Sequence, residues 1–125
     1  APATPGERWE RIGLGIRLGY NPCKPEVARY WVALGQRLAE DGVQDEMRVL
    51  RRTLTVLLQV AHDEALPWFW RSVCLEQTAR PLARLQTLLS RTEPTQAEAM
   101  QAAAQAARDC LDALPAPCRA ARGAP

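Results

Sequence analysis

Four cysteines are the residues of this chain best suited to chemistry, and they are spread widely over its 125 residues. They are Cys23, Cys74, Cys110 and Cys118. No two of them form a CxxC pair, the close spacing that structural zinc sites and redox motifs commonly use. Cysteines so spaced can form disulfides, pack as buried thiols, or act as nucleophiles where a basic neighbour lowers the thiol pKa.

The single histidine, His62, is followed by Asp63 and Glu64. These three residues are the only cluster in the sequence that resembles a set of general acid–base catalysts. Adjacent residues on a helix point in different directions, so this triplet is not a preassembled catalytic group. A histidine near the C-terminal end of a helix is instead favoured by the helix dipole. Thiolates with His62 could in principle hold zinc, but structural zinc sites usually draw their ligands from close sequence pairs, and this sequence contains none. It also contains no phosphate-binding, zinc-protease or serine-hydrolase motif. We expect no enzyme, no catalytic residue, no metal site and no cofactor.

The strongest helical pattern lies in residues 43–91, where apolar residues recur at steps of three and four and so share one helix face. Pro67 divides this stretch into two helices folded back on each other. Pro81 should kink or split the second of them, because proline has no N–H to donate. The apolar positions of the first helix are Met47, Leu50, Leu54, Leu57 and Ala61.

Further helices are expected over residues 25–41 and 95–114, the latter with an alanine-rich seam suited to close packing. The N-terminal segment supports two interpretations. Trp9, Ile12, Ile16 and Tyr20 fall on one helical face, yet residues 12–20 also alternate in the period of a strand. Because the sequence offers no second strand, we favour a helix; a strand would imply strand exchange or self-association through residues 12–20.

These elements predict an all-α, up-and-down bundle of four to five helices in a single domain over residues 1–125, with frayed termini at 1–4 and 119–125. Alternating helix directions place all four cysteines within about 10 Å of one end along the bundle axis. We therefore expect two disulfides that staple this end, and hence a periplasmic or secreted protein. Three pairings are open: Cys110–Cys118 with Cys23–Cys74, which we favour, Cys23–Cys118 with Cys74–Cys110, and Cys23–Cys110 with Cys74–Cys118.

The aromatic residues Tyr20, Trp68, Phe69 and Trp70 belong to the same end of the bundle. The last three crowd one helical turn and cannot all point inward, and an exposed tryptophan is a typical interface anchor. These four are our candidate binding residues, although bulky filling of the bundle end explains them equally well. We expect a non-enzymatic interaction module that binds another protein, for example as an accessory of an envelope assembly.

Other classes of function fit the sequence less well. A net charge of +2, with aromatics not interleaved among the fifteen arginines, gives no indication of nucleic-acid binding. No apolar run approaches the length of a transmembrane helix. A small-molecule or lipid-binding bundle and a secreted helical signalling factor remain as alternatives; the short connections argue mildly against the crossover topology of the signalling class.

Overall fold

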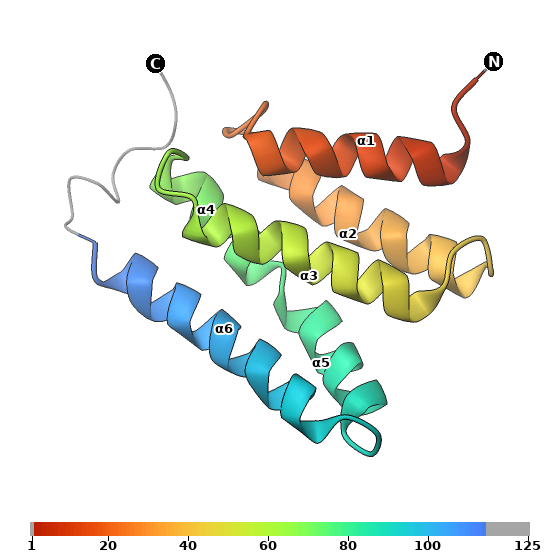
Figure 1. The fold of residues 1–125 in the computed structure, drawn as a ribbon. Coiled ribbons are helices and arrows are strands. Elements are labelled where there is room, and N and C mark those ends of the chain that lie inside the picture. The colour runs from red at the N-terminus through yellow and green to blue at the C-terminus, as the bar shows by residue number, and fades with distance from the viewer. Residues whose placement is uncertain (1, 115–125) are drawn as a thin grey trace.

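A computed structural model describes residues 2–114 of the chain, and within this range the structure is entirely helical (Figure 1). Six helices follow one another along the chain, joined by connections of two to six residues. They are α1 (Pro5–Leu18), α2 (Pro25–Glu40), α3 (Glu46–His62), α4 (Trp68–Glu76), α5 (Ala79–Leu89) and α6 (Pro94–Asp112). The prediction of an all-α fold is confirmed. No helix in the described range is both long and apolar enough to cross a bilayer.

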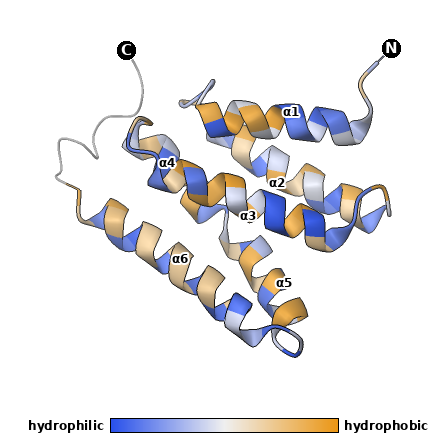
Figure 2. Ribbon diagram, viewed as in Figure 1, coloured by the Kyte–Doolittle hydropathy of each residue, from blue (hydrophilic) through white to orange (hydrophobic). Residues whose placement is uncertain are grey.

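Helix α3 is the centre of the molecule and contacts each of the other five helices. On one side it packs with α1, α2 and α4, and on the other with α5 and α6. Figure 2 shows apolar residues along α3 and paler, weakly hydrophobic residues along the alanine-rich α6. Seven residues of α3 are buried: Val49, Thr53, Leu54, Val56, Leu57, Val60 and Ala61.

Residues 12–18 are helical, so the alternative of a strand in this segment is wrong. Thr4 caps α1 by accepting a hydrogen bond from the backbone N–H of Glu7 (3.1 Å). The helix ends at Gly19, which adopts a left-handed conformation (φ 66°) that glycine takes without the steric cost other residues meet. Strand exchange through residues 12–20 therefore has no strand to start from, and Tyr20 lies beyond the helix whose face it was expected to share.

The long helix expected after Pro67 is split into α4 and α5, as Pro81 suggested. Pro81 has no N–H for the carbonyl of Gln77, four residues earlier, and the break falls at Gln77–Thr78. The Thr78 side chain donates a hydrogen bond to the carbonyl of Leu75 (2.6 Å) and stabilises the turn. This split makes six helices where four to five were expected, and it sends α5 away from α2.

Two tryptophans hold α1 against α2. The rings of Trp9 and Trp31 stack with centroids 5.0 Å apart and planes 10° from parallel. Trp9 Nε1 donates to the carbonyl of Trp31 (2.9 Å), and Trp31 Nε1 donates to the carbonyl of Trp9 (2.7 Å). Each ring also lies over a glycine of the opposite helix, Trp9 over Gly35 and Trp31 over Gly13. Each helix thus carries a tryptophan four residues before a glycine, and the two patterns interlock.

The cysteines do not form the expected staple. Cys23, in the turn after α1, and Cys110, on α6, are exposed, whereas Cys74 is buried in the core between α4 and its neighbours. No disulfide joins any two of these three, and Cys118 lies outside the described residues. Each of the three predicted pairings requires one bond among Cys23, Cys74 and Cys110, so two disulfides are not supported. Cys74 points into the core, whereas Cys23 and Cys110 lie on the surface.

We predict that replacing Gly13 or Gly35 by alanine destabilises the fold. A Cβ on Gly13 would lie 2.8 Å from Trp31 Cζ2, and one on Gly35 would lie 2.7 Å from Trp9 Nε1. Each change should lower the free energy of unfolding in urea by about 1–3 kcal/mol, because overpacking outweighs the better helix propensity of alanine. Gly15→Ala is the matched control, since its Cβ would meet only Tyr20 at 3.4 Å. Equal effects at all three positions would contradict the interlocking.

We predict that the thiols of Cys74 and Cys110 react very differently in the folded protein. Burial raises the pKa of Cys74 to about 12, so this thiol carries almost no thiolate at neutral pH. Iodoacetamide labelling without reductant, followed by peptide mapping, should modify Cys110 in the native protein and Cys74 only in urea. A Cys74 that resists labelling in urea until a reductant is added would show that it is in a disulfide.

Candidate binding site

The two tryptophans at the start of α4 point to opposite sides of the molecule. Trp70 is 1% exposed and donates its indole N–H to the carbonyl of Ile16 in α1 (3.0 Å). Trp68 is half-buried and donates to the carbonyl of Leu111 in α6 (3.1 Å). Phe69, between them, is also half-buried and packs against the core formed with α1 and α2. The crowding is therefore relieved by placing α4 between α1 and α6, rather than by leaving a tryptophan in solvent.

Tyr20 is the exposed member of the predicted group, with 68% of its surface accessible. Its ring lies beside Gly15 of α1, next to a surface hollow of about 240 Å³. The edge of Trp70 reaches the same hollow, so the structure brings two of the four predicted residues together and places Trp68 elsewhere. The hollow is lined by Arg11, Ile12, Gly15, Ile16, Tyr20, Asn21, Val27 and Trp70.

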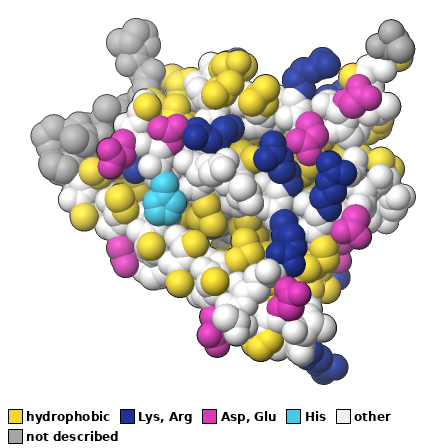
Figure 3. Space-filling model, viewed as in Figure 1, with side chains coloured by type: hydrophobic (Ala, Val, Ile, Leu, Met, Phe, Trp, Pro, Cys, Tyr) yellow, Lys and Arg dark blue, Asp and Glu magenta, His cyan; other side chains and the backbone are white. Residues whose placement is uncertain are grey.

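Two leucines of α1 extend this exposed surface. Leu14 is 51% exposed and Leu18 is 48% exposed, and their spacing of four residues places them on one helix face. Together with Tyr20 they form what we call the apolar patch. Figure 3 shows hydrophobic side chains gathered over this part of α1. Sequence analysis missed the leucines, although they stand outside the stripe of Trp9, Ile12 and Ile16 and so had no core to enter.

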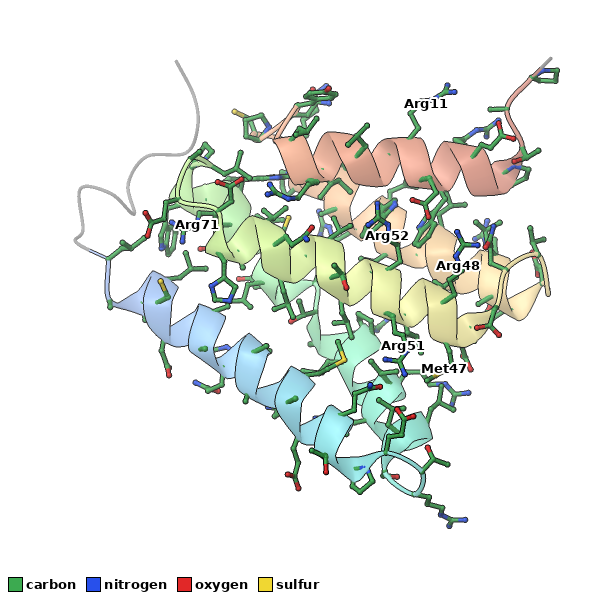
Figure 4. The ribbon with its side chains drawn as sticks, in the orientation of Figure 1. Arg11, Met47, Arg48, Arg51, Arg52 and Arg71 are labelled. Carbon is green, nitrogen blue, oxygen red and sulfur yellow. The ribbon has the colours of Figure 1, made fainter. Side chains whose placement is uncertain are left out.

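One ion pair and one hydrogen bond from a buried arginine close the end of α3 near this patch. Arg17 of α1 donates to Asp63, which follows α3, with Nη1 and Oδ2 2.6 Å apart. Asp63 also accepts a hydrogen bond from the backbone N–H of Ala65, and these contacts, with that of Arg17 first, lower the pKa of its carboxyl group. Arg71 of α4 is buried and donates its Nε–H to the carbonyl of Ala61 (3.0 Å), so it occupies the negative end of the α3 dipole (Figure 4). His62 is exposed beside them.

Three further arginines, Arg48, Arg51 and Arg52, gather on α3 and line a shallow surface hollow. On the face shown in Figure 3, several basic side chains gather over α3, with acidic side chains among and around them. Arg52 pairs with Glu10 of α1 (3.2 Å), and Arg51 pairs with Glu93 before α6 (3.6 Å). Figure 4 shows Arg52 reaching from α3 toward α1, whereas Arg11 points away from the bundle. The ion pairs of Arg51 and Arg52 link helices, whereas Arg48 has no ion-pair partner among the described residues.

Neither a metal site nor a similar protein identifies the function. Within residues 2–114, no group of three or more His, Cys, Asp or Glu side chains could hold a metal ion. Comparison with protein-family models, with curated proteins and with solved structures gives no significant match to this chain. The candidate site is therefore defined by geometry alone: an exposed apolar patch beside a small hollow at one end of α1.

We predict that the Arg17–Asp63 pair stabilises the fold in a pH-dependent way. Because the pKa of Asp63 is lower in the folded state, the pair contributes fully above the unfolded pKa of about 3.9, and its contribution is lost as pH falls through the folded pKa. Arg17→Gln should lower the free energy of unfolding at pH 7 by up to about 1 kcal/mol, since the pair is partly exposed. Urea titrations from pH 7 down to pH 2 measure the difference from the unmodified protein.

The control is Arg11→Gln, since Arg11 lies on the same helix and forms no ion pair with any described residue. It should change stability little at any pH. A deficit of Arg17→Gln that stays constant down to pH 2 would show that the ion pair is not its source.

Proposed function

We propose that this protein is a non-enzymatic module that binds another protein through the apolar patch. The observation that carries the proposal is the gathering of large, half-exposed apolar side chains, Leu14, Leu18 and Tyr20, at one end of α1. Most other large apolar residues of the described chain are buried or partly buried. Contiguous apolar surface on a soluble domain is a common mark of an interface.

The shape of the patch favours a protein partner over a small ligand. The hollow of about 240 Å³ is smaller than the roughly 300–1,000 Å³ typical of small-molecule sites. Tyr20 lines the hollow, whereas Leu14 and Leu18 are not among its lining residues, so a small ligand in the hollow would leave the apolar surface of both leucines in water. A partner that places one side chain against Gly15, and covers both leucines, would bury it.

Gly15 gives the patch a specific feature. Its missing side chain leaves the backbone of α1 open beside Tyr20, and an added Cβ would meet only the Tyr20 ring. A partner side chain can therefore approach the helix backbone closely at this point, which glycine alone allows. We attach no cellular compartment to the proposed function, because the inference of export rested on two disulfides that are not supported.

We predict that acidic substitutions in the apolar patch abolish partner binding. A photo-crosslinking amino acid at position 20 in place of tyrosine should yield a defined crosslinked product in cells that make the protein naturally. Adding Leu14→Glu or Leu18→Glu should reduce that product at least about tenfold, because each places a charge in a desolvated contact. Circular dichroism and the urea midpoint check that the variants remain folded.

Val43→Glu is the matched control. Val43 is 54% exposed in the turn between α2 and α3, away from the apolar patch. It carries the same change in charge at a similarly exposed apolar position and should leave crosslinking intact. If the folded Leu14→Glu protein gives as much product as Val43→Glu, the patch is not the binding surface.

A further inference from the structure

A second, larger groove lies on a different part of the molecule, where α2 and α5 diverge over α3. Its volume is about 620 Å³, and it is open to solvent along one side. Three helices line it: α2 and α5 are the walls and α3 is the floor. The lining residues are Val32, Gln36, Ala39 and Glu40 of α2, Glu46, Val49, Leu50 and Thr53 of α3, and Arg80, Pro81, Ala83 and Arg84 of α5.

The groove follows from the break between α4 and α5. Helix α4 packs against both α2 and α3, whereas α5 turns away at Gln77–Thr78 to pack against α3 and α6. The strip of α3 that a straight helix would have covered is left between the walls. Pro81, whose missing N–H accompanies the break, is buried and itself lines the groove.

The lining residues have the spacing of helix faces. Val32, Gln36 and Ala39 recur at steps of four and three on α2, and Glu46, Leu50 and Thr53 recur at steps of four and three on α3. From Val32 to Glu40 the α2 wall runs about 12 Å, the length of roughly two helical turns. Apolar and small side chains make up the centre of the floor and walls, so a helix can pack there with its own ridges between theirs.

The two rims differ in charge. On the α2 side, Glu40 accepts a hydrogen bond from Gln36 Nε2 (3.1 Å) and has no ion-pair partner among the described residues. On the α5 side, Arg84 is held by Glu46 through two hydrogen bonds of 3.0 and 3.1 Å. Arg80 has no ion-pair partner in residues 2–114. One acid on α2 and one base on α5 are therefore left to meet charges of opposite sign.

We propose that this groove binds an amphipathic helix of a partner protein, whose apolar stripe is flanked by a basic residue on one side and an acidic residue on the other. The basic residue faces Glu40 and the acidic residue faces Arg80. Such flanking charges set the direction in which a helix lies, as they do in coiled coils. The groove and the apolar patch are separate surfaces, so this inference does not depend on the function proposed above.

The charged rims and the open side argue against other occupants. A small apolar ligand would offer no charged partner to Glu40 or Arg80. Because the groove is open, one side of such a ligand would also remain in water. A second copy of this chain would have to present a helix with an exposed apolar stripe about two turns long. On α1, Leu14 and Leu18 span a single turn, and on α6 the exposed Ala99, Ala102 and Ala106 form a two-turn stripe of methyl groups that would bury little apolar surface in the groove.

The test is selection from a displayed library of helical peptides against the full chain. The library fixes leucine at positions 1, 4 and 8 of each helix and randomises both flanks. Peptides with one basic and one acidic flank should be enriched and should bind in fluorescence titrations. Ala83→Trp, which fills the groove from an exposed position, should weaken binding at least about tenfold. Ala106→Trp, an exposed alanine of α6 that lines no groove, is the matched control and should have no effect.

Charge compensation gives the second measurement. Glu40→Lys should weaken binding of a mixed-flank peptide by about threefold and strengthen binding of a peptide with two acidic flanks. Enrichment of no peptide, equal loss with Ala83→Trp and Ala106→Trp, or no exchange of preference in Glu40→Lys would overturn the proposal. A dimer in sedimentation that Ala83→Trp dissociates would also overturn it, because the groove would then hold a second copy of the chain.

Discussion

The structure depends on the need to cover the wide apolar face of α3, which leaves only one polar stripe of that helix exposed. A helix with a wide apolar face is stable only when other elements pack against that face. Helices α1, α2 and α4 form one half of that cover, and α5 and α6 form the other. The short α4 can reach both halves because the chain breaks at Gln77–Thr78. The same break leaves one strip of α3 less covered, and the groove is that strip.

Tryptophan indoles connect the covering helices to one another. All four donate their N–H to a backbone carbonyl of another helix: Trp9 and Trp31 exchange bonds between α1 and α2, Trp70 bonds to α1, and Trp68 bonds to α6. Each bond satisfies a buried or half-buried polar group while the ring fills space, which is how large aromatic residues are commonly accommodated in a core. This use leaves Tyr20 as the aromatic residue of the predicted binding group that solvent reaches most.

The positions of the helices were predicted well from the sequence, because apolar periodicity and proline positions are local signals. The stripe of residues 43–65 and the break near Pro81 needed no tertiary information. The cysteines show the limit of that reasoning. Helix lengths predicted a common level for them along the bundle, but disulfide formation also requires the right rotation of each helix. Cys110 stands beside the seam of Ala107 and Leu111 rather than on it, so its exposure could have been read from the pattern. The inward position of Cys74 depends on where α4 lies, which only packing decides.

The same dependence on packing explains why neither candidate surface could be predicted from the sequence. The apolar patch exists because Gly19 ends α1 before Tyr20 and because Leu14 and Leu18 lie outside its core stripe. The groove exists because two walls that are distant in sequence diverge over one floor. In both places the sequence contains a local signal: Gly19 ends a helix and Pro81 breaks one. The surface that results is formed by several helices, so the local signal alone does not predict it. α2 contributes Val27 to the hollow at its beginning and Val32 to the groove about one and a half turns later. One helix therefore serves both surfaces from different positions, which would allow two partners to be held at once.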